Sequence, residues 1–72
     1  PLAGLIDIAA ERTRLGKERE KAAGEARKVQ QKLSNADFVK RAPEEVVEEN
    51  RERLAGYEME MGRLDAALAR LV

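Results

Sequence analysis

Two stretches of this sequence place mostly apolar side chains in alternating steps of three and four residues, and a short polar segment separates them. Such steps keep one stripe of a helix facing a partner helix along its whole length, as in coiled coils. The first stripe reads Leu5, Ile8, Arg12, Leu15, Arg19, Ala22, Ala26, Val29 and Leu33. The second reads Val47, Asn50, Leu54, Tyr57, Met61, Leu64, Leu68 and Leu71. These stripes predict two long helices, over about residues 7–33 and 43–71.

The residues at the ends of both stretches are typical of helix ends. Asp7 precedes the first stretch and is a predicted N-cap, because its carboxylate can accept a hydrogen bond from the first turn. Pro43 suits the first turn of the second helix, where its missing N–H group has no intrahelical acceptor. Glu44 and Glu45 follow and complement the positive end of that helix. Residues 34–42 contain Ser, Asn and Asp and are predicted to be a loop.

A loop of this length between two long helices brings the second helix back antiparallel to the first. The predicted fold is therefore all-α, a two-helix antiparallel coiled-coil hairpin forming a single unit over residues 1–72. In the register that places Leu33 opposite Val47, Asp65 and Glu58 or Glu60 lie where they can pair with Arg12 and Arg19. Glu25 meets Arg53 across the other edge. We expect Phe38 and Val39, the apolar residues of the loop, to fold back and close the turn end of the hairpin.

The composition excludes most chemistry. The 72 residues include no Cys and no His, so the chain lacks a disulfide framework, a thiolate metal site and the commonest general base. It also has no Gly-rich phosphate loop. We expect no catalytic site, metal or cofactor in this chain. No apolar run approaches the roughly 20 residues of a membrane span, so a cytoplasmic location without membrane contact is the default expectation. The start at Pro1 without Met predicts a segment of a longer protein.

Charge divides unequally between the two predicted helices although the chain is neutral overall. Residues 7–33 hold eight basic and five acidic side chains, a net charge of +3, and residues 34–43 add +1. Residues 44–72 hold eight acidic and four basic side chains, a net charge of −4. This division predicts that the first helix, rather than the second, faces a polyanion.

Basic residues of the first helix are also ordered in space. Arg14, Lys21 and Lys28 recur every seven residues on the outward face, as expected of residues that track a phosphate backbone. The alternative is an ordinary solvated face of a coiled coil. There is no platform of interleaved aromatic residues, so any RNA contact should read shape and backbone. The predicted nucleic-acid-binding residues are Arg14, Lys17, Lys21, Arg27, Lys28, Lys32, Lys40 and Arg41.

Three segments are more specific than a coiled coil requires. The chain opens LAGLID at residues 2–7, continues AERTRLGKE at residues 10–18 and turns through KLSNADFVKRAPEEVV at residues 32–47. Together they resemble the C-terminal arm of bacterial valyl-tRNA synthetase (valine–tRNA ligase), which has a similar opening and a loop of the form KLxNxxFVxxAPxxVV. The resemblance covers nearly the whole chain.

The resemblance implies an accessory module rather than an enzyme. In that family the arm is an antiparallel coiled coil that leans on the outer corner of tRNA, where the D and T loops meet. Matching positions that can face RNA are Arg14, Lys17, Lys32 and Lys40. The implied partners are tRNA, specifically tRNA-Val, and the remainder of the synthetase, and the hairpin should be monomeric. The HIGH and KMSKS signatures of the synthetase ATP site are absent from this chain. The resemblance therefore implies that ATP is used by other parts of the parent enzyme.

Two other interpretations remain open from the sequence. The stripes suit a protein–protein coiled coil for dimerisation or scaffolding, although the Pro-containing loop and the acids opposite Arg12 and Arg19 favour a hairpin. An arm like the N-terminal hairpin of seryl-tRNA synthetase also contacts tRNA, but it lacks this loop pattern.

Overall fold

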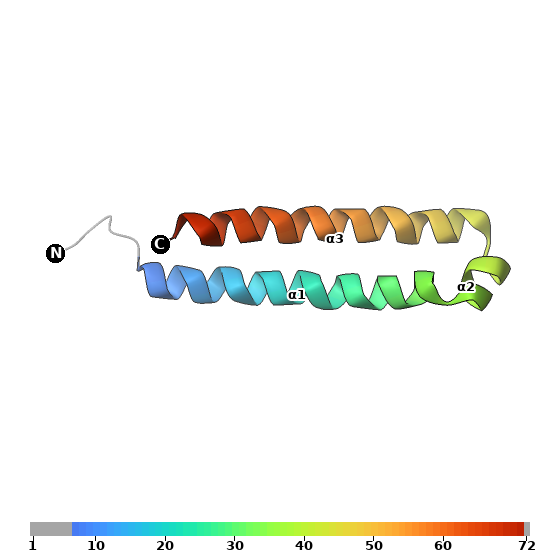
Figure 1. Cartoon of the computed structure of the whole chain (residues 1–72), viewed down its shortest axis with the longest axis horizontal. Coiled ribbons are helices and arrows are strands. Elements are labelled where there is room, and N and C mark those ends of the chain that lie inside the picture. Colours follow the sequence, from blue (N-terminus) through green and yellow to red (C-terminus); the bar gives the residue numbers. More distant parts are fainter. Residues whose placement is uncertain (1–6, 72) are drawn as a thin grey trace.

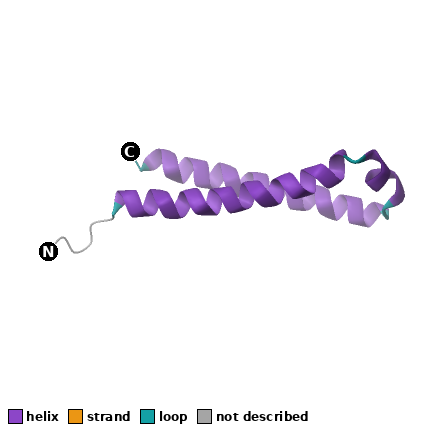
Figure 2. Cartoon of the chain, turned by 90° about the horizontal axis from the view of Figure 1, so that it is seen from below, coloured by secondary structure: helices purple, strands orange, loops and turns teal. Residues whose placement is uncertain are grey.

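The computed structural model describes residues 7–71 as three helices, α1 Ile8–Ser34, α2 Ala36–Arg41 and α3 Glu44–Arg70. α1 and α3 lie side by side and run in opposite directions, and α2 lies at the turn end (Figure 1). Seen from below, the two long helices cross at a shallow angle (Figure 2). The predicted all-α class is confirmed over the described residues. The helix count was wrong, because the predicted loop contains α2.

Asn35 explains why a helix forms in the segment predicted to be a loop. Its backbone N–H donates to the Lys32 carbonyl at 3.1 Å, which ends α1. Its side-chain Oδ1 accepts hydrogen bonds from the N–H groups of Asp37 at 3.0 Å and Phe38 at 3.3 Å, which begins α2. Asn is a favoured N-cap as well as a helix breaker. The prediction of a loop rested only on the second property.

α2 ends at Arg41, and its C-cap residue Ala42 has an extended backbone at φ −70° and ψ 150°, which the following proline favours. Pro43 is the N-cap residue of α3, with φ −55° and ψ 143°, so it precedes the first helical turn instead of lying within it. Phe38 and Val39 are half-buried, whereas the other four residues of α2 are exposed. α2 therefore turns its apolar side inward at the turn end, in the sense expected of these two residues.

The other predicted N-cap is confirmed. The Oδ1 atom of Asp7 accepts a hydrogen bond from the N–H group of Ala10 at 3.1 Å. Leu5, predicted to begin the first stripe, lies outside the described residues, as does the opening motif up to residue 6.

The core is a single line of side chains between α1 and α3. All but one of the buried residues belong to the predicted stripes: Leu15, Ala22, Ala26, Val29, Val47, Asn50 and Leu64. Ala23 is buried as well, although it lies beside the stripe. The remaining stripe residues of α3 are only partly covered. A core this narrow leaves most side chains of both helices exposed to solvent.

Two long-range contacts hold the register at the end away from α2. The Arg19 guanidinium donates to both carboxylate oxygens of Asp65, at 2.7 and 3.2 Å, which is one of the pairings that the register allows. Arg12 was expected to reach a carboxylate, but its Nη1 atom donates to the Leu71 carbonyl oxygen at 2.6 Å. Carbonyl groups at the end of a helix lack intrahelical partners and carry partial negative charge, which makes them acceptors for such a cation.

Candidate nucleic-acid interface

The structure places all eight predicted RNA-facing residues at exposed positions. Six lie on α1 and two on α2. The α1 residues are Arg14, Lys17, Lys21, Arg27, Lys28 and Lys32, and the α2 residues are Lys40 and Arg41. Exposure is necessary for RNA contact, but the eight residues differ in how much of their charge is available.

Arg14 is engaged by acids of its own helix. Its guanidinium donates to both carboxylate oxygens of Glu11, at 2.7 and 2.9 Å, and to Glu18 at 3.1 Å. The hydrogen bond from Arg14 lowers the pKa of the Glu11 carboxyl, and the same bond raises the pKa of Arg14. A phosphate would therefore have to compete with two carboxylates for this side chain.

The same arrangement recurs along α1. Lys28 lies 3.5 Å from Glu25, and Arg27 lies 3.1 Å from Glu20. Glu11, Glu18 and Glu25 repeat every seven residues, each three residues before a member of the basic row. The i, i+3 spacing of this acidic row is visible in the sequence, but the prediction from the basic row left it out.

Five of the eight residues have no carboxylate within ion-pair distance among residues 7–71: Lys17, Lys21, Lys32, Lys40 and Arg41. Lys17 and Lys21 lie midway along α1, whereas the other three lie at the turn end (Figure 1). Three of the five cations without an ion-pair partner therefore lie at the turn end.

Part of this charge has a structural role. Lys32 lies in the last turn of α1, and Lys40 and Arg41 lie in the last turn of α2. Cations at these positions favour the helix because the last carbonyl groups carry partial negative charge. This interaction leaves the side chains exposed, so they remain accessible to a polyanion.

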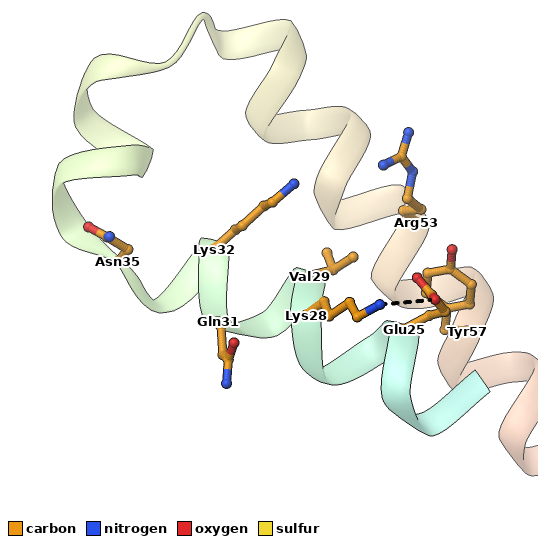
Figure 3. A pocket seen from close by; sticks show the side chains of 8 residues that line it. All are labelled: Glu25, Lys28, Val29, Gln31, Lys32, Asn35, Arg53 and Tyr57. Carbon is orange, nitrogen blue, oxygen red and sulfur yellow. Dashed lines mark hydrogen bonds and ion pairs between the residues drawn. The ribbon is translucent and has the colours of Figure 1, made fainter. Parts of the chain in front are cut away.

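A hollow between α1 and α3 begins beside these residues (Figure 3). It is lined by Glu25, Lys28, Val29, Gln31, Lys32, Asn35, Arg53 and Tyr57. Arg53 and Tyr57 belong to α3 and were not predicted to face RNA. Arg53 was expected to pair with Glu25, but Glu25 interacts instead with Lys28 on its own helix. The sequence did indicate that Arg53 and Tyr57 lie on the same side of α3, because they are four residues apart.

Other hollows on the described surface have a different charge. One is lined by Glu18, Lys21, Ala22, Glu25, Tyr57, Glu60 and Arg63. Another, at the start of α3, is lined by Glu44, Glu45 and Glu48. No group of acidic, His or Cys side chains suited to holding a metal ion exists within residues 7–71. None of the three helices described is long and apolar enough to cross a membrane.

Comparison with known proteins assigns this helical unit to a family. The family model described as the valyl tRNA synthetase tRNA binding arm matches residues 7–72. Valine–tRNA ligase of Granulibacter bethesdensis is 65% identical over 71 residues, which are 99% of this chain and 8% of that protein. The ligase of Gluconobacter oxydans is 59% identical with the same coverage, and that of Caulobacter vibrioides is 57% identical over 70 residues, 97% of this chain and 8% of the relative.

The chain therefore belongs to the valyl-tRNA synthetase tRNA-binding-arm family, as the resemblance predicted. It spans about 8% of the length of the curated relatives it matches. No solved structure matches it.

Proposed function

We propose that this chain is the accessory tRNA-binding arm of a valine–tRNA ligase and that it contacts the outer corner of tRNA-Val. The observation that carries the proposal is the family match over residues 7–72. The exposed cations without carboxylate partners at the turn end support it, because phosphate contacts supply most of the affinity for nucleic acid. Valine attachment, with its use of ATP, would then reside in the remainder of a cytoplasmic ligase.

The structure also refines which residues should contribute most. Arg14 and Lys28 are engaged by Glu11, Glu18 and Glu25, so their net contribution to a phosphate contact is reduced. Lys40 and Arg41 form no ion pair among the described residues, although Asp37 precedes them on α2 by three and four residues. We therefore expect the turn end to contribute more to RNA affinity than the middle of α1.

The test measures tRNA binding by the full-length protein, with and without the arm, at two salt concentrations. Removing the arm should weaken binding, and the loss should be larger at low salt. Equal affinity with and without the arm would refute the proposal.

A charge variant tests the same proposal without deleting the fold. The double substitution Lys40→Gln and Arg41→Gln removes two charges at the turn end. It should reduce the slope of log affinity against log salt by about two units, one for each lost phosphate contact. Arg51→Gln with Arg70→Gln is the matched control, since it removes the same charge from exposed positions of α3.

Dimerisation through the helix stripes is the competing function. Within residues 7–71, Leu15, Val29, Val47 and Leu64 are already buried between α1 and α3 of the same chain. Pairing between chains through these stripes would require the hairpin to open. Sedimentation at several concentrations separates the two possibilities, because the hairpin should remain a monomer.

A further inference from the structure

The hollow beside Tyr57 differs in charge from its neighbour along the same edge of the hairpin. Its lining includes three basic residues, Lys28, Lys32 and Arg53, and one acidic residue, Glu25. The adjoining hollow has three acidic and two basic residues in its lining. The two hollows share Glu25 and Tyr57, so the net charge changes from +2 to −1 between adjacent hollows. An anion would therefore be favoured on the side of Tyr57 toward α2.

The cations of this hollow come from both long helices. Lys28 is engaged by Glu25 at 3.5 Å, which leaves Lys32 on α1 and Arg53 on α3 without a carboxylate partner among residues 7–71. The Lys32 side chain extends from α1 toward α3 (Figure 3). Arg53 lies one helical turn before Tyr57. Two cations on opposite walls of a hollow can approach one anion from both sides.

Tyr57 adds a neutral donor to these cations. Its side chain is half-buried, and its hydroxyl makes no hydrogen bond to the other residues that line the hollow (Figure 3). A guanidinium presents a planar fork of N–H donors that matches two oxygens of a phosphate, and an ammonium adds a compact charge. The lining of the hollow therefore includes a guanidinium, an ammonium and a hydroxyl, all three of which can donate to an oxyanion.

We propose that this hollow binds a backbone phosphate of the RNA, with Lys32 and Arg53 on either side and the Tyr57 hydroxyl donating a third hydrogen bond. The proposal rests on the proposed tRNA-binding function and extends the contact surface from α1 and α2 onto α3. An RNA backbone is the favoured occupant because Lys32 is also part of the exposed positive charge at the turn end. One strand can therefore contact the cations around α2 and continue into the hollow.

The test compares Arg53→Gln with Arg51→Gln in the full-length protein. Both residues are exposed on α3, two positions apart, but Arg53 lines the hollow, whereas Arg51 does not and lies 3.5 Å from Glu48. The Arg53 variant should bind tRNA roughly threefold to tenfold more weakly, and its salt slope should fall by about one unit. The Arg51 variant should match the unmodified protein. Equal affinity and equal salt slope in the two variants would overturn the proposal.

Tyr57→Phe tests the neutral donor separately. The substitution keeps the ring in the stripe and removes only the hydroxyl, so affinity should fall by roughly twofold to tenfold with an unchanged salt slope. A loss from Arg53→Gln without a change in salt slope would also refute the phosphate assignment.

The outcome for the hollow is separable from the outcome for the proposed function. If Lys40→Gln with Arg41→Gln weakens binding and Arg53→Gln does not, the hollow is excluded and the tRNA-binding role stands. If neither variant changes tRNA affinity, and removing the whole arm does not change it either, both proposals fail. Circular dichroism of the 72-residue chain carrying each substitution checks that the helices of the arm remain folded.

Discussion

Replacing three helix glycines by alanine should stabilise the arm substantially. A Cβ atom built on Gly16, Gly56 or Gly62 meets nothing within 4 Å. All three residues lie inside the long helices, α1 and α3. Glycine in a helix interior costs about 1 kcal/mol relative to alanine, mainly through the backbone entropy of the unfolded chain. Because the added methyl groups share no neighbours, the three effects should add to about 2–3 kcal/mol.

Urea unfolding of the 72-residue chain, followed by circular dichroism, measures this gain. With a slope of about 1 kcal/mol per molar urea for a chain of this size, the triple variant should raise the midpoint by roughly 2–3 M. Ala55→Gly is the reverse control, since Ala55 is exposed on α3, and it should cost about 1 kcal/mol. A triple variant that is no more stable would show that the glycines serve a contact or a bend not present in this structure.

Two further substitutions test the core and its flank. Asn50 is buried, and its Nδ2 donates a hydrogen bond to the Val46 carbonyl at 2.8 Å, whereas its Oδ1 has no partner among the described residues. Because an unpaired buried acceptor is costly, Asn50→Leu should raise the free energy of unfolding by about 1–2 kcal/mol, measured by thermal unfolding. A loss of stability would instead assign Asn50 a role in register. The hydrogen bond from Arg19 lowers the pKa of Asp65 below its ordinary 3.8, so the stability from this pair is present above that pH and is lost as pH falls through the lower folded pKa. Asp65→Asn should therefore flatten the stability profile below about pH 4, and an unchanged profile would contradict the assignment.

The helices were predictable because burial along each stripe repeats with the period of the sequence. Leu15, Val29, Val47 and Leu64 occupy the core where the steps of three and four place them. Local capping was predictable only in part. Asp7 has one role, at the start of α1, whereas Asn35 ends one helix and begins the next. The residue type of Asn35 is compatible with ending a helix and with capping one, so it did not show that Asn35 does both.

Ion-pair partners were harder to predict than positions. Arg19 pairs with Asp65, one of the acids expected near it, but Glu25 had two basic residues within reach and interacts with Lys28 instead of Arg53. Such choices depend on side-chain rotamers, which sequence spacing does not specify. This choice matters for the proposed phosphate-binding hollow, because Glu25 engages Lys28 and leaves Arg53 without a carboxylate partner among residues 7–71.

The equal length of the two long helices sets how far the turn end lies from the other end of the hairpin. α1 and α3 have 27 residues each, about 40 Å of helix, and α1 begins at the same end at which α3 finishes (Figure 1). Deleting seven facing residues from each helix would keep both stripes in phase and draw the turn back by about 10.5 Å. Deleting them from one helix alone would leave its partner's stripe uncovered. Paired heptad deletions or insertions would therefore change the reach of this arm while keeping the two stripes in contact.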